Sequence, residues 1–121
     1  MKYMLLVYSN EEAWSEAELE KCYRESAGLA RQLSASGHYL SASPLHPTPT
    51  ATSVRVRDGK RTVTDGPFAE TREQLGGYYL IEATDLDEVI GIAERIPVAS
   101  RGTIEIRPVM EIEGLPEVLR S

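Results

Sequence analysis

Residues 64–79, TDGPFAETREQLGGYY, hold most of the side chains in this sequence that suit acid–base or ligand-binding chemistry. Asp65 stands in an Asp-Gly-Pro turn. If that turn places the carboxylate, partly buried, at the mouth of an apolar cavity, its pKa rises and it can exchange protons with a ligand. The structural alternative is an Asx-turn, in which the carboxylate accepts a bond from a nearby backbone N–H. Arg72 can receive a substrate carboxylate in a bidentate pair, although Glu70 and Glu73 compete for it.

Four aromatic side chains are the further candidates for ligand contact. Phe68 is the sole phenylalanine, and we expect it to anchor the loop in the core, with a place in a pocket wall as the alternative. Tyr78 and Tyr79 are strand neighbours, so their side chains point to opposite faces of a sheet. One of them should present its hydroxyl on the open face, as should Tyr8, unless each packs in the core with its hydroxyl bonded. The preceding Gly76-Gly77 indicates a β-bulge or space left for a ligand.

The remaining candidates for catalysis or metal binding are two histidines and one cysteine. His38 follows a helix-ending glycine and is expected at the surface. His46 lies in a proline-rich loop, and we consider it as an imidazole that folds over the cavity mouth beside Asp65. Cys22 lies on a predicted helix stripe and is expected to be buried and inert. Because these residues form no metal-ligand cluster, and no phosphate loop or dinucleotide fingerprint is present, we predict neither a metal site nor a cofactor.

The first strand and helix are predicted from periodicity and capping. Residues 2–8, KYMLLVY, place apolar side chains on both faces of a strand. Ser15 and Glu18 have the spacing of a capping box, and Gly37 has the place of a C-terminal glycine cap. Between them, apolar residues recur at helical spacing: Leu19, Cys22, Tyr23, Ala27, Ala30 and Leu33.

The middle of the chain predicts a β-hairpin. Residues 53–65, SVRVRDGKRTVTD, contain Asp58-Gly59, the residue pair that suits a two-residue turn. This turn sets Val54 across from Val63. We interpret the hairpin as an arm off the main sheet.

The rest of the chain predicts a strand, a helix and a last strand. Residues 76–83 are again apolar on both faces of a strand, and Thr84 or Asp85 caps the second helix. Residues 103–112 alternate apolar and charged side chains. Pro108 has no N–H for a ladder, which predicts that this strand lies at a sheet edge.

A short second strand is also expected near Tyr39 to Ala42, after the first helix. Without the arm, the order of elements is then β-α-β-β-α-β, which predicts a ferredoxin-like α+β fold. Helices can cover only one face of such a sheet, yet the first and third strands are apolar on both. We therefore expect a homodimer in which a second copy covers the open face.

Composition narrows the class of protein. The 121 residues fit a single domain spanning 1–121, and 41% apolar with 26% charged residues is typical of a globular protein. A net charge of −6 disfavours nucleic-acid and anionic-membrane partners and leaves small molecules and proteins. No signal peptide and no segment long enough to cross a bilayer is evident, so a cytoplasmic location is expected.

Five segments together resemble the YCII-related family, in the branch named for its DGPF motif. They are MKYMLLVYS, TATSVRVRDGK, VTDGPFAETREQLGGYYLIEA, DLDEVIGIAERIP and IEIRPVME, and Thr64 to Tyr79 is the most specific part. The resemblance implies a dimeric α+β barrel. In the wider family a His/Asp pair is the proposed acid–base site, with the His in the first helix. This chain has no His between Glu16 and Ser36, so only the acid carries over, at Asp65.

Two functions follow from these observations, and a dimer that is only a scaffold is the third alternative. The first is a small-molecule enzyme or binder with its site in the dimeric barrel near Asp65, Phe68 and Tyr78. The second is a non-catalytic regulatory module associated with an extracytoplasmic-function sigma factor, as the genes of some DGPF relatives suggest. A cavity with a carboxylate of raised pKa favours the first.

Overall fold

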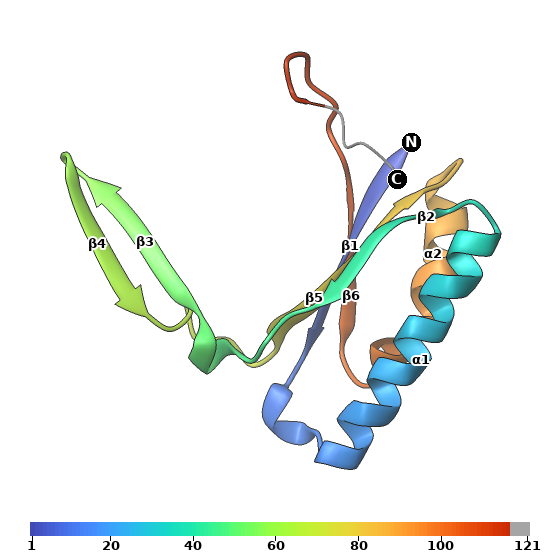
Figure 1. The fold of residues 1–121 in the computed structure, drawn as a ribbon, viewed down its shortest axis with the longest axis horizontal. Coiled ribbons are helices and arrows are strands. Elements are labelled where there is room, and N and C mark those ends of the chain that lie inside the picture. The colour runs from blue at the N-terminus through green and yellow to red at the C-terminus, as the bar shows by residue number, and fades with distance from the viewer. Residues whose placement is uncertain (117–121) are drawn as a thin grey trace.

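The chain forms a four-stranded antiparallel sheet with both helices on one face and a separate two-stranded arm (Figure 1). The computed structural model describes residues 1–116. The sheet has the order β2-β5-β1-β6. Its strands are β1 (Lys2–Ser9), β2 (Tyr39–Pro44), β5 (Gln74–Glu82) and β6 (Thr103–Pro108). Leaving the arm aside, this is the β-α-β-β-α-β order of a ferredoxin-like fold, as predicted.

Both predicted caps of α1 (Glu16–Ala35) are present. The Ser15 hydroxyl accepts from the Glu18 N–H at 3.2 Å, and the Glu18 carboxylate accepts from the Ser15 N–H at 2.9 Å. At the other end Gly37 has a φ of +83°, and the His38 N–H donates to the Leu33 carbonyl at 2.8 Å. This is a Schellman motif, which satisfies carbonyls that the helix leaves free.

The second helix, α2 (Leu86–Glu94), begins at Asp85, whose carboxylate accepts from the Glu88 N–H at 2.9 Å. Three short 3₁₀ turns complete the connections: η1 (Glu11–Ala13), η2 (Thr48–Thr50) and η3 (Pro97–Ser100). None of the helices within residues 1–116 is long and apolar enough to cross a membrane.

The core lies between the helices and one face of the sheet. It is built from alternate residues of β1 and β5, from one side of each helix and from the segment around η3. Its fully buried side chains are Leu5, Leu33, Ile81, Val89 and Ile96. The α1 stripe is only partly as predicted, because Tyr23 and Ala27 are exposed, whereas Leu29, outside that stripe, is buried.

The sheet edge and the bulge agree with the sequence. β6 is an edge strand and ends at Pro108. Val7 pairs with Gly77 and Tyr8 with Leu75, so Gly76 is the extra residue of a β-bulge.

The arm consists of β3 (Thr52–Arg57) and β4 (Lys60–Asp65), which pair only with each other. Val54 lies opposite Val63, the register that the Asp58-Gly59 turn sets. The arm leaves the sheet at the end where β2 stops and β5 starts, and it extends on the side opposite the helices (Figure 1).

Candidate active site or ligand cavity

A cavity of about 500 Å³ lies between α1 and the β2–β5 side of the sheet. It sits on the helix-covered face, beside the exposed part of α1 that the periodicity had assigned to the core. Most of its wall is apolar. The lining comprises Val7, Cys22, Tyr23, Ser26, Ala27, Ala30, Arg31, Tyr39, Ala42, Ser43, Pro44, Gly76, Gly77, Tyr78, Tyr79, Ile96 and Val98.

The floor of the cavity depends on a close approach of β2 to β5 at Gly77. A Cβ atom on Gly77 would lie 2.8 Å from the Ser43 carbonyl oxygen and 3.1 Å from the Pro44 Cα. Both contacts are to backbone, which cannot swing aside as a long side chain does. Only glycine therefore allows the two strands to meet here, and the bulge at Gly76 lies directly beside this contact.

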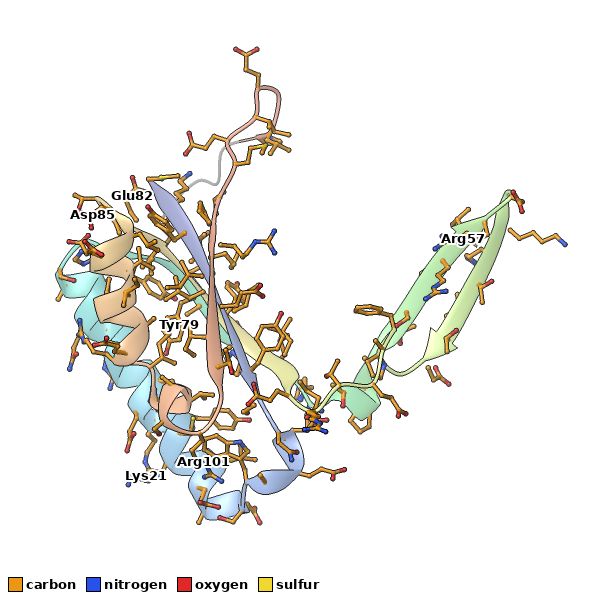
Figure 2. All side chains as sticks on the ribbon, turned by 180° about the vertical axis from the view of Figure 1, so that it is seen from behind. Lys21, Arg57, Tyr79, Glu82, Asp85 and Arg101 are labelled. Carbon is orange, nitrogen blue, oxygen red and sulfur yellow. The ribbon has the colours of Figure 1, made fainter. Side chains whose placement is uncertain are left out.

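Tyr79 joins the sheet to α1 inside this wall (Figure 2). Its side chain is 5% exposed, and its hydroxyl donates to the Ser26 carbonyl at 3.0 Å. Burial raises the pKa of the Tyr79 hydroxyl above 10.0, the value of an unperturbed tyrosine. The phenol is therefore neutral at physiological pH and acts as a hydrogen-bond donor.

Cys22 is the second ionisable group deep in the wall. Its sulfur lies 4.0 Å from the Ser26 hydroxyl. Burial raises the pKa of the thiol above its usual value, and Glu25 raises it further. Because the thiolate is the reactive form, a protonated Cys22 is a weak nucleophile.

Within the described part of the chain, Arg31 supplies the one cationic side chain of the wall. Its guanidinium lies along α1, 3.8 Å from where a Cβ on Gly28 would stand. Among residues 1–116 it has no carboxylate within ion-pairing distance. The described residues thus give the cavity an apolar body, several neutral hydroxyl and thiol groups and one positive charge at its exposed side.

A second, polar hollow lies where the charged loop meets the start of the chain. The Glu11 carboxylate accepts from the Thr48 N–H at 3.2 Å and also from the Thr48 hydroxyl. The Glu11 N–H donates to the Gln74 side chain at 3.0 Å. Arg72 borders this hollow. These bonds tie three loops together, so the polar groups that line the hollow serve the structure.

Comparison with known proteins identifies the family. The YCII-related domain matches residues 1–113. An uncharacterized protein of Rhizobium meliloti (strain 1021) is 39% identical over 113 residues, which cover 89% of this chain and 91% of that protein. This chain belongs to the YCII-related family.

In this YCII-related chain the predicted Asp65 is the last residue of β4, and its side chain is exposed. It lines neither the cavity nor the polar hollow. Within the described chain its carboxylate has no hydrogen-bond partner, so the turn is made without it. Gly66 adopts a φ of +106°, and its N–H donates to the Ala51 carbonyl at 2.7 Å. Within residues 1–116, the prediction that the Asp65 carboxylate closes an Asx-turn is therefore wrong.

The other predicted residues of the DGPF loop are also outside the cavity. Phe68 is 82% exposed, so the expectation that it anchors the loop in the core of its own chain is wrong. His46 is exposed in the loop between β2 and β3. Arg72 is exposed at the polar hollow. One charged residue of the loop has a structural contact, because the Glu73 carboxylate accepts from the Thr103 hydroxyl at 2.8 Å.

The tyrosines divide between the two faces of the sheet, as the alternation predicts. Tyr79 faces α1, whereas the Tyr78 hydroxyl shares a 2.9 Å hydrogen bond with the Ser41 hydroxyl on the open face, and Tyr78 also borders the cavity. Tyr8 is on the same open face and donates to Glu105 at 3.3 Å. Burial, and then Glu105, raise the pKa of the Tyr8 hydroxyl.

The side of α1 that lines the cavity was not predicted from the sequence. Cys22 was expected in the core, and Tyr23 and Ala27 were assigned to the same buried stripe. A helix with apolar residues over a wider arc than its sheet can cover signals such a cavity. Ser26 and Arg31 carried no signal of their own, because a polar residue beside that stripe is typical of any amphipathic helix.

Proposed function

We propose that this YCII-related chain binds a small molecule with an apolar body and an anionic group in the cavity beside α1. The volume of about 500 Å³ falls in the range typical of small-molecule sites. Alanine, proline and aromatic side chains offer apolar contact to the body of the ligand. Arg31 offers the charge-assisted hydrogen bonds that a carboxylate or sulfonate accepts.

The polar groups of the cavity favour binding over catalysis by its own walls. Cys22 and Tyr79 both stay protonated at neutral pH, since burial raises both pKa values. Neither is poised to take a proton from a substrate. The observation that carries the proposal is therefore a mostly apolar cavity in which, of the described residues, only Arg31 is charged.

We further propose that the chain is a member of the DGPF branch and forms a homodimer of the α+β-barrel type. Asp65-Gly66-Pro67-Phe68 supplies the motif. Support for the dimer comes from the open sheet face, where Met4, Leu6 and Leu80 are apolar residues that no helix covers. An acid–base role for Asp65 with His46, and ligand contact by Phe68, require a second copy to enclose these exposed residues, and both stay predictions.

Regulation through a sigma factor also stays a prediction. It differs from small-molecule binding in what it requires, namely an outer surface that docks a protein rather than an enclosed cavity. A substitution that fills the cavity leaves such docking unchanged, which separates the two functions.

Fluorescence titration with anilinonaphthalene sulfonate tests the cavity, because this probe has an apolar body and one anionic group. Ala27 is exposed and lines the cavity, so Ala27→Trp should fill the space without disturbing the core. Ala17→Trp is the matched control, because Ala17 is exposed on the same helix and outside the lining.

We expect saturable binding of one probe per chain in the wild type and in Ala17→Trp, and loss of that binding in Ala27→Trp. Arg31→Gln should weaken it by about tenfold, the effect of about 1.4 kcal/mol. Equal binding by both tryptophan variants would show that the probe sits elsewhere and would refute the proposal.

A further inference from the structure

One face of the arm is mainly apolar and the other is basic, and neither is covered by the rest of residues 1–116. Residues directly opposite each other in the β3–β4 ladder share a face. Val54, Val56 and Val63 therefore lie together on one face, with Arg61 beside them opposite Val56, and the three valines are 62%, 61% and 54% exposed. Arg55, Arg57 and Lys60 lie on the other (Figure 2 labels Arg57). A two-stranded sheet with an exposed apolar face is marginally stable in water, so this arm fits a partner surface.

The outer edge of β3 has unpaired backbone groups. The residues that flank a two-residue turn, Arg57 and Lys60, form a hydrogen-bonded pair. Because bonded and non-bonded pairs alternate, Thr52, Val54 and Val56 direct their N–H and C=O groups away from β4. In agreement, the Val56 carbonyl accepts from the guanidinium of Arg57 at 3.1 Å. This edge is a template for a further strand.

The segment 109–113, which follows β6, has the pattern of such a strand. Val109 is still held by the sheet, since its N–H donates to the Lys2 carbonyl at 2.9 Å. Residues 110–113 continue past the end of β1 and make no backbone hydrogen bond to the rest of residues 1–116. Met110 and Ile112, which are 81% and 57% exposed, alternate with glutamates at 111 and 113.

We propose that residues 109–113 of one copy add as a third strand to the outer edge of β3 in a second copy. The alternation then places Met110 and Ile112 on the valine face of the arm. The two glutamates fall on the basic face, which carries Arg55 and Arg57, whichever way the added strand runs. Strand addition of this kind takes its affinity from main-chain bonds and its specificity from the alternating side chains.

A second copy, rather than the same chain, must supply the strand. β2 ends and β5 begins beside the base of the arm, whereas β6 ends at the opposite end of the sheet, so the arm and segment 109–113 are far apart within one chain (Figure 1). A two-fold axis perpendicular to the strands brings these opposite ends together in two copies.

Charge favours the same partner. The arm, residues 52–65, carries four basic and two acidic residues, whereas the rest of the chain carries nine basic and seventeen acidic ones. Within residues 1–116, the one ion pair of Glu111 is to Lys2 at 3.9 Å, between two exposed side chains. Such a pair contributes little, so it does not hold the segment back.

Charge reversal with rescue tests the pairing in the full-length chain. We expect Arg55→Glu with Arg57→Glu to weaken dimerisation by about tenfold or more, because two facing pairs become repulsive. Glu111→Arg with Glu113→Arg should do the same, and combining all four substitutions should restore most of the affinity. Lys21→Glu with Arg24→Glu makes the same change in net charge on α1 and should leave the dissociation constant unchanged. Sedimentation velocity over a dilution series measures it.

Disulfide trapping between two differently tagged chains gives the second test. Ile112→Cys in one chain should cross-link to Val54→Cys or Val56→Cys in the other, as identified by mass spectrometry of the joined peptides. Thr62→Cys, on β4 and on the opposite face of the arm, should not cross-link. Two results would overturn the proposal. One is a variant with all four charge substitutions that dimerises no more tightly than the weaker-binding of the two double variants. The other is cross-linking of Ile112→Cys to Thr62→Cys as readily as to Val54→Cys and Val56→Cys.

Discussion

The two faces of the main sheet are built from alternate residues of the same strands, yet only one face is buried against the helices. In β1, Leu5 is fully buried against the helices, whereas its neighbour Leu6 is only half-buried on the open face. In β5, Tyr79 bonds to α1 and Tyr78 bonds within the open face to Ser41. A side chain's place in the alternation, rather than its hydrophobicity, decides whether it belongs to the core of the chain.

This difference separates folding from recognition. The helix-covered face contains the core and, beside the edge strand β2, the cavity next to α1. The open face has a central apolar strip, Met4, Leu6 and Leu80, between polar groups on the edge strands. Its tyrosine hydroxyls bond within that face, to Glu105 and to Ser41, and the proposed second copy would cover the apolar strip between them.

The largest expected effect breaks one face while sparing the other. Leu5→Asp places an unpaired charge in the core and should prevent folding, since such burial costs several kcal/mol. Leu6→Asp places the same charge on the open face, so the chain should fold as a monomer. Circular dichroism and sedimentation of both variants measure the outcomes. A folded Leu5→Asp, or a Leu6→Asp that remains fully dimeric, would contradict the division of the two faces.

A pair of neighbouring glycines sharpens the comparison on the cavity side. Gly77→Ala forces β2 and β5 apart and should cost roughly 2 kcal/mol, as overpacking does. Gly76→Ala adds a Cβ whose nearest contact is 3.8 Å away, so its effect should stay within about 0.5 kcal/mol. Urea denaturation gives both values. Equal costs at the two positions would mean that the β2 contact does not restrict this site.

The two tyrosines give a smaller contrast with a pH signature. Tyr79→Phe removes a buried hydrogen bond and should cost about 1 kcal/mol, and Tyr78→Phe should cost less because its partner is nearer to solvent. The folded pKa of Tyr79 is raised, so its stabilising effect is present below pH 10.0 and is lost as the pH rises above that value.

Stability of the Tyr79→Phe variant should therefore fall less between pH 9 and 11, values chosen around the usual tyrosine pKa of about 10, than that of the wild type. Tyr8 and Cys22 remain in both proteins and shift in the same direction, so only the difference between the curves reports on Tyr79. Parallel curves would show that Tyr79 titrates as an exposed phenol.

The smallest effect is expected at Asp65. Because the described chain offers its carboxylate no partner, Asp65→Ala and Asp65→Asn should each change the free energy of unfolding by less than about 0.5 kcal/mol. Denaturation of the Leu6→Asp monomer background isolates this effect from any dimer. A loss of about 1 kcal/mol in the alanine variant alone would restore the capping role that the structure does not support.

Much of the fold followed from local signals in the sequence. The capping box at Ser15, the glycine at 37, the edge position of Pro108 and the turn at Asp58-Gly59 each depend on a few neighbouring residues. Such features can therefore be predicted from short stretches of sequence. The two-sided apolar strands also predicted an uncovered face, because the helices of this arrangement lie on one side only.

The cavity could not be predicted in the same way. Its existence depends on how closely α1 packs on the sheet, which is a property of tertiary packing. Tyr23 and Ala27 fit a buried stripe by spacing, yet both are exposed and border the cavity. Asp65 and Phe68 drew attention because their motif is distinctive, but both lie on the arm side of the loop, away from the cavity of their own chain.

Methyl-group NMR of the alanine- and methionine-labelled protein tests the central claim, that a small molecule binds on the helix-covered face. Ala30 and Ala42 line the cavity, whereas Met4 lies on the open face and Met110 in the segment after β6. On titration with anilinonaphthalene sulfonate, the resonances of both alanines should shift and saturate together while those of both methionines stay in place. Shifts at Met4 with unchanged Ala30 and Ala42 would locate the ligand on the open face and contradict the account.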